Sequence, residues 1–134
     1  MSRKLSARIA SVVLFVHGFV ELIGAVVLLA LPSEFLATKG YVMKEGEVAF
    51  SIVLAAIFGL SRLAAGYITW SIRRWGITFS VALGVTTMIA APLMHLLGAI
   101  ALSSVVMDLV LAIAVVAFSF YALFGNEAIA STKS

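Results

Sequence analysis

Four long runs of apolar residues decide what this chain can fold into. They cover residues 9–31, 48–71, 76–97 and 104–124, with short polar stretches between them. A bilayer core about 30 Å thick is crossed by roughly 20 apolar residues in an α-helix, and each run is long enough. The strands of a membrane β-barrel would alternate apolar and polar residues, which these runs do not. The sequence therefore predicts an all-α integral membrane four-helix bundle with up-down topology, in a single transmembrane domain that comprises residues 1–134.

The overall composition agrees with lipid as the solvent. Of the 134 residues, 63% are hydrophobic and 11% are charged, whereas a soluble domain is about half apolar and about a quarter charged. The chain has no cysteine, which excludes disulfides, thiol catalysis and thiolate metal sites. The net charge of +3 does not indicate nucleic-acid binding, because the basic residues sit at helix ends and form no basic face.

The placement of lysine and arginine predicts the orientation. One side of the predicted bundle receives most of the basic residues, namely Arg3, Lys4, Arg8, Arg73, Arg74 and Lys133. The other side receives Lys39 and Lys44, amid glutamates. The positive-inside rule then places both termini in the cytoplasm. The same interface receives the aromatic residues Tyr67, Trp70, Trp75 and Tyr121, as expected of an aromatic belt.

Ionisable side chains within the predicted spans are the candidate functional residues. They are His17, Glu21, Arg62, His95 and Asp108. Such residues cost about 2.5–3.5 kcal/mol each at the bilayer centre and often carry function. A rise of about 1.5 Å per residue from the cytoplasmic end of each span predicts two layers. His17, Glu21 and Arg62 form a middle polar cluster, and His95 and Asp108 form an outer polar pair.

An ion pair between Glu21 and Arg62 is the simplest way to satisfy both charges. His17 and Glu21 are four residues apart, so they share a helix face, which Gly24 continues. Arg62 lies on a stripe of small residues that would let the first helix come close, formed with Ala55, Gly59 and Gly66. The pair would either fix helix packing and register, or give Glu21 a role in binding a headgroup or a proton. His17 is expected to be neutral and hydrogen-bonded to Glu21, or to a threonine at positions 86–87.

No cofactor or metal is predicted. The two histidines, His17 and His95, differ in expected depth by about 15 Å, too far to ligate one haem iron. His17 and Glu21 alone supply too few ligands for a metal. A small-residue stripe at Gly76, Ser80 and Gly84 indicates close helix contact, either inside the bundle or at a dimer face.

Three short stretches resemble known membrane proteins. Glu21-Leu22-Ile23-Gly24 resembles the membrane-embedded glutamate motif of small multidrug resistance transporters, which have no arginine to match Arg62. The spacing of His17 and Glu21 is similar to a pair in sterol-isomerase-like membrane proteins. The stretches at 62–67 and 73–76 are similar to those of uncharacterised prokaryotic four-helix proteins, which implies a prokaryotic plasma membrane as the location.

The sequence leaves two classes of function open. The short loops favour a non-enzymatic accessory or assembly subunit, whose partners would be the lipid bilayer and either a membrane subunit or further copies of this chain. The alternative is a proton- or ion-coupled carrier of small amphipathic molecules that uses Glu21. An enzyme is disfavoured, because His17 and Glu21 are the only residues suited to act as acid and base.

Overall fold

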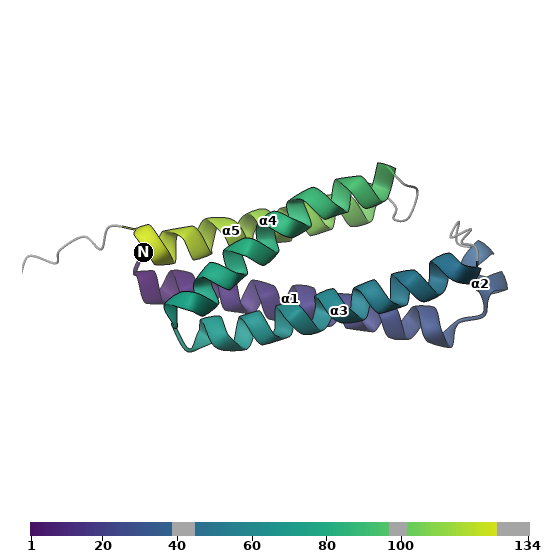
Figure 1. Cartoon of the computed structure of the whole chain (residues 1–134), viewed down its shortest axis with the longest axis horizontal. Coiled ribbons are helices and arrows are strands. Elements are labelled where there is room, and N and C mark those ends of the chain that lie inside the picture. The colour runs from purple at the N-terminus through teal and green to yellow at the C-terminus, as the bar shows by residue number, and fades with distance from the viewer. Residues whose placement is uncertain (39–44, 97–101, 126–134) are drawn as a thin grey trace, which may run out of the picture.

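The structure is a computed structural model that describes residues 1–38, 45–96 and 102–125. Its helices are α1 (Arg3–Ala30), α2 (Ser33–Thr38), α3 (Glu45–Trp70), α4 (Arg74–Leu96) and α5 (Leu102–Phe124) (Figure 1). No β-strand occurs among the described residues. Every helix except α2 is long and apolar enough to cross a membrane, which confirms the all-α class and the four long apolar helices expected from the sequence.

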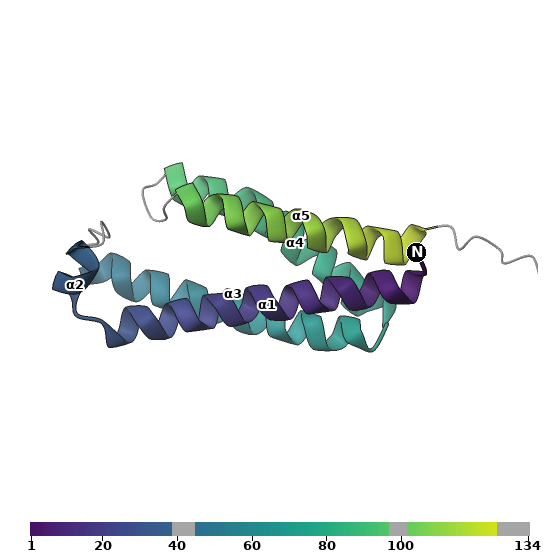
Figure 2. The ribbon, with the colours of Figure 1, turned by 180° about the vertical axis from the view of Figure 1, so that it is seen from behind.

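The four long helices form two hairpins, α1–α3 and α4–α5, that pack side by side (Figures 1 and 2). The N-terminus, the turn between α3 and α4, and the end of α5 lie at one end of the bundle, which we call the N-terminal end. The hairpins are close together there and diverge toward the opposite end, where α2 lies. Along the bundle α1 packs on α5 and α3 packs on α4.

Helix α1 begins at Arg3, six residues before the apolar run that predicted it. The Ser2 side chain caps it by accepting a hydrogen bond from the Leu5 backbone at 3.2 Å. The first turn is anchored to the last turns of α5. Arg3 Nε donates to the Ala122 carbonyl at 2.9 Å, and Ser6 Oγ donates to the Phe118 carbonyl at 2.6 Å. The polar residues before the run are therefore part of the bundle.

Helix α4 runs through Pro92 and ends at Leu96, as its predicted length required. The polar stretch between the first two apolar runs contains the short helix α2, at Ser33–Thr38. Most of the third connection, predicted at 98–103, lies outside the described residues, as do Lys39, Lys44 and Lys133.

Small residues bring α1 and α3 into close contact. A Cβ atom added at Gly18 would lie 2.8 Å from the Gly59 carbonyl oxygen, so the two backbones touch at this level. About two turns away, Ser11 Oγ donates to the Gly66 carbonyl at 2.6 Å. This confirms the predicted role of the stripe on α3, because small residues allow close approach of helices in a membrane.

The second small-residue stripe also faces the inside of this bundle. Gly76, Ser80 and Gly84 are all buried. A Cβ atom at Gly76 would meet Ile68 and one at Gly84 would meet Val116, while Ser80 Oγ is 2.6 Å from Thr69 Oγ1. The interpretation of this stripe as a dimer face was therefore wrong.

Candidate functional site

Arg62 is the centre of the polar cluster inside the bundle. Its Nη1 atom forms an ion pair with Oε2 of Glu21, so the pair expected from the sequence is present. Nη2 donates to Thr87 Oγ1 at 2.6 Å, and the guanidinium lies 5.3 Å from the centroid of the Phe58 ring. Thr87 in turn donates to the Leu83 carbonyl at 2.9 Å. Arg62 is only 3% exposed, and these contacts compensate its buried charge.

His17 is hydrogen-bonded to Asp108, at 3.1 Å between Nε2 and Oδ1. The sequence predicted that His17 is hydrogen-bonded to Glu21 or to a threonine, and that Asp108 belongs to an outer layer. Both assignments were wrong because α1 begins earlier than expected. Counting depth from residue 9 instead of Arg3 displaces His17 by about 9 Å. The bonds from Arg3 to Ala122 and from Ser6 to Phe118 fix the antiparallel register that brings Asp108 beside His17.

Gly24 also differs from its expected place. Gly24 does not continue a packed face: it is exposed, and a Cβ atom there would meet nothing within 4 Å. The side chain of Leu22 instead packs against Gly59. His95 is half-buried in the last turn of α4, at the end of the bundle where the sequence placed it, and it is not among the residues that line the cavity described next.

A cavity of about 140 Å³ lies between the two hairpins and meets this polar cluster. Its charged lining residues are Glu21, Arg62 and Asp108, and its uncharged polar ones are Ser51 and Thr87. Its apolar walls come from α3 and α4, through Leu54, Ala55, Phe58, Ala90, Ala91 and Met94. α1 and α5 contribute one carboxylate each. The cavity thus combines apolar walls from α3 and α4 with three ionisable side chains.

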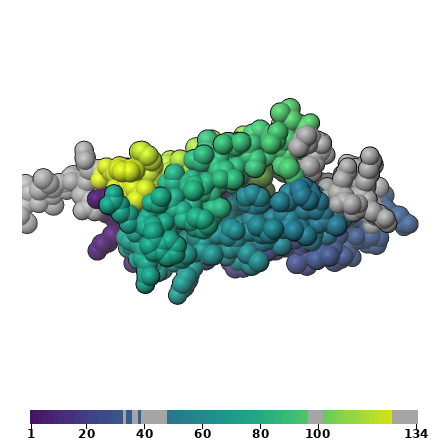
Figure 3. Space-filling view, viewed as in Figure 1, coloured from purple at the N-terminus to yellow at the C-terminus, as the bar shows by residue number. Residues whose placement is uncertain are grey.

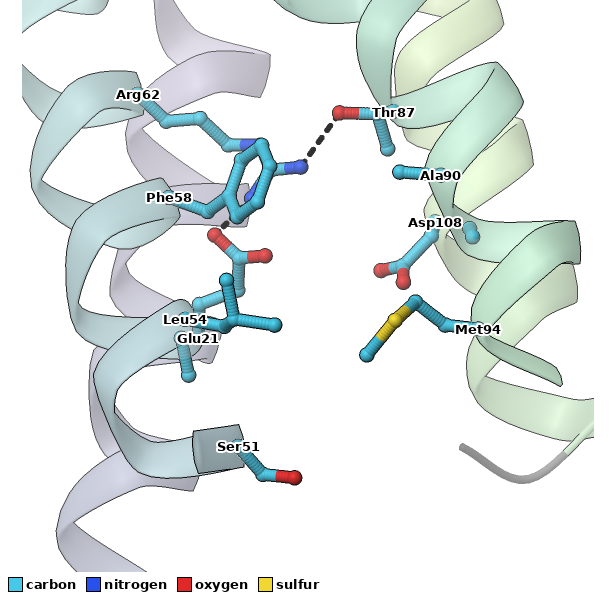
Figure 4. Close-up of a pocket in the computed structure, with 11 residues that line it drawn as sticks. Glu21, Ser51, Leu54, Phe58, Arg62, Thr87, Ala90, Met94 and Asp108 are labelled. Atoms are coloured by element: carbon cyan, nitrogen blue, oxygen red, sulfur yellow. Dashed lines mark hydrogen bonds and ion pairs between the residues drawn. The ribbon is translucent and has the colours of Figure 1, made fainter. Parts of the chain in front are cut away.

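The two carboxylates lie on opposite sides of this cavity, Glu21 with the α1–α3 hairpin and Asp108 with the other (Figure 4). Their side chains are 19% and 21% exposed, against 4% for Arg62 and 2% for His17. Both carboxylates and Arg62 therefore line the cavity, with the carboxylates more exposed, while His17 is buried and does not line it.

The cavity is open on one side (Figure 3). In that view α3 and α4 touch toward the N-terminal end, and a notch separates them toward the opposite end. Both helices carry apolar side chains that are exposed on the outside of the bundle, such as Ile57 and Ile89. The opening of the cavity therefore lies between α3 and α4, whose outer faces are apolar.

The described residues contain no group of three or more His, Asp or Glu side chains close enough to hold a metal ion. The donors near the cavity are instead arranged in two separate pairs, Glu21 with Arg62 and His17 with Asp108. This arrangement suits recognition of a charged group better than coordination of a metal.

Two features of this site were not found from the sequence. The role of Thr87 as acceptor for Arg62 depends on the rotation of α4, which the almost uniform hydrophobicity of that helix does not reveal. The meeting of His17 and Asp108 depends on the α1–α5 register. A usable signal was present, because Ser2 is a good N-cap residue and would have started α1 at Arg3.

Comparison of the chain with models of known protein families, with curated proteins and with solved structures gave no match. The likenesses of its short motifs to known membrane proteins are therefore not supported over a larger part of the chain.

Proposed function

We propose that this chain is a non-enzymatic integral membrane protein that binds a small cationic amphipathic molecule in the cavity between α3 and α4, and acts as a carrier for it. The observation that carries this proposal is the pair of carboxylates, Glu21 and Asp108, that face one another across an open cavity with apolar walls.

The size and the lining of the cavity support a ligand with an apolar body and a positive group. Its volume of about 140 Å³ is close to that of an engineered apolar cavity of about 150 Å³ that holds benzene. Phe58, Leu54 and Met94 would contact the apolar body. The two carboxylates lie in a region of low dielectric constant, where attraction for a cation is stronger than in water.

The ion pair suggests how binding would be coupled to a proton or another ion. A cation beside Glu21 would compete with Arg62 for the same carboxylate, and at Asp108 it would compete with His17. A cation that displaces a proton bound to one of these carboxylates would likewise leave the net charge of the site unchanged. The four ionisable groups form two pairs, Glu21 with Arg62 and His17 with Asp108. Because each group already has a partner, we favour exchange of a cation at a carboxylate over acid–base catalysis.

We place the carrier in a prokaryotic plasma membrane with both termini in the cytoplasm. The basic residues Arg3, Lys4, Arg73 and Arg74 gather at the N-terminal end of the bundle, which supports this orientation under the positive-inside rule. The cavity notch then opens toward the outer leaflet.

Titration of the purified protein in a neutral detergent with benzyltrimethylammonium tests this function by calorimetry. We expect saturable binding of this cation and none of phenylacetate, which has the same ring but a negative charge. Asp108→Asn should weaken binding at least about tenfold, because it removes a charge partner from a desolvated site. An asparagine oxygen still accepts a hydrogen bond from His17, so the fold should be kept.

Glu34→Gln is the matched control, since it removes a carboxylate that is exposed on α2 and does not line the cavity. It should leave the affinity unchanged. Absence of binding, or equal binding of phenylacetate, would contradict the proposal. If the protein then purified with a stoichiometric membrane partner, the accessory-subunit interpretation would take its place.

A further inference from the structure

A second pocket lies at the N-terminal end of the bundle, on the far side from the notch. Its volume is about 340 Å³. Three cationic side chains line it, Arg3 and Lys4 from α1 and Arg74 from α4, and no acidic residue is among its lining residues in the described part of the chain. Residues that lie far apart along the chain, on α1, α4 and α5, therefore meet to form a basic concave surface.

One of the three cations is held in place. Arg3 Nε donates to the Ala122 carbonyl at 2.9 Å, and its Nη2 atom donates to the Leu123 carbonyl. These are carbonyls of the last turn of α5, which otherwise have no partner within their helix. Lys4 and Arg74 are exposed and face the same pocket. The pocket thus contains one positive charge that hydrogen bonds hold in place, on Arg3, and two on the exposed side chains of Lys4 and Arg74.

The rest of the pocket is apolar, and its surroundings mark the surface of a membrane. Ile77, Ala122 and Leu123 form its inner wall. Trp70 and Trp75, at the same end of the bundle, are 48% and 57% exposed. Exposed tryptophans are typical of the depth at which lipid headgroups lie. An occupant of this pocket would therefore meet cations at the headgroup level and apolar side chains just below.

We propose that this pocket binds the phosphate group of an anionic phospholipid, with Lys4 and Arg74 as the residues that recognise it. A basic pocket between the ends of transmembrane helices is suited to such a headgroup. The apolar wall would contact the glycerol and the first part of the acyl chains. This site is separate from the cavity between α3 and α4, so it does not depend on the proposed carrier function.

Native mass spectrometry of the full chain tests the proposal. The protein is incubated in detergent with equal amounts of phosphatidylglycerol and phosphatidylcholine that carry the same acyl chains. We expect phosphatidylglycerol to be retained in preference. Arg74→Gln should lower that preference about fivefold, the effect of one cation near an anionic headgroup. Lys4→Gln should act in the same direction.

Arg73→Gln is the matched control, because Arg73 is adjacent, equally charged and exposed, but does not line the pocket. It should leave the preference unchanged. Equal retention of the two lipids, or an equal effect of Arg73→Gln and Arg74→Gln, would overturn the proposal. Displacement of the bound lipid by millimolar glycerol 3-phosphate would also overturn it, since the occupant would then be a soluble phosphate.

Discussion

Arg62 and Glu21 differ in how far contacts inside the protein compensate the charge of each side chain. The guanidinium is buried and has three partners, Glu21, Thr87 and the Phe58 ring. The carboxylate has Arg62 on one side and the cavity on the other. The arginine therefore serves mainly to position a carboxylate at the cavity, and it depends on that carboxylate for its own compensation. A structural and a binding role for the pair are compatible in this arrangement.

Thermal unfolding in detergent tests the coupling of the two charges. Glu21→Gln or Arg62→Met alone should destabilise the protein by about 3–5 kcal/mol, because each leaves a charge without its partner. The double variant should recover much of that loss. Glu34→Gln provides the control for removal of an exposed carboxylate, with an effect near zero. Losses that simply add in the double variant would show that the two side chains act independently.

At the scale of the helices, close packing of α1 on α3 determines where Glu21 lies. Gly18 touches the backbone of α3 at Gly59, one turn from Glu21. In contrast Gly24 is exposed on the same helix and meets nothing. Gly18 is thus tightly packed against α3 and Gly24 is not, although both are glycines of the same helix.

Alanine at each of these glycines should have opposite effects on thermal stability. Gly18→Ala should lower the unfolding temperature, since its Cβ atom would lie 2.8 Å from the Gly59 carbonyl and the helices would have to separate. It should also weaken binding of benzyltrimethylammonium, because Glu21 would shift. Gly24→Ala should be neutral or stabilise by about 0.5–1 kcal/mol, the usual gain from replacing glycine inside a helix. Equal losses from the two variants would contradict the packing described for α1 and α3.

The helices could be predicted from the sequence much better than their relative depths. Length and hydropathy were sufficient for the four spans, and even for the passage of α4 through Pro92. The Glu21–Arg62 pair followed from two charges in lipid that each require compensation. The pairing of Asp108 with His17 could not be predicted from hydropathy, because it depends on where α1 begins. The polar residues before residue 9 carry no hydrophobic signal that would mark this start. The cavity depends on the divergence of the hairpins, which no local pattern in the sequence encodes.

As a whole, the molecule is a pair of hairpins that are joined tightly at one end and apart at the other. The basic pocket lies at the closed end, and the carboxylate cavity lies between the hairpins toward the open end. With the orientation proposed above, the pocket would lie in the cytoplasmic leaflet and the cavity in the membrane interior. Both assignments depend on four membrane spans with the N-terminal end inside, which is the central claim.

Labelling of single cysteines in intact cells with a membrane-impermeant maleimide tests that claim most directly, because the native chain contains no cysteine. Glu34→Cys on α2 and Ser71→Cys in the α3–α4 turn are matched positions, both exposed and at opposite ends of the bundle. We predict that position 34 is labelled in intact cells, and that position 71 is labelled only after the membrane is permeabilised. Labelling of position 71 but not position 34 in intact cells would contradict the orientation, and labelling of both would contradict the four-span arrangement.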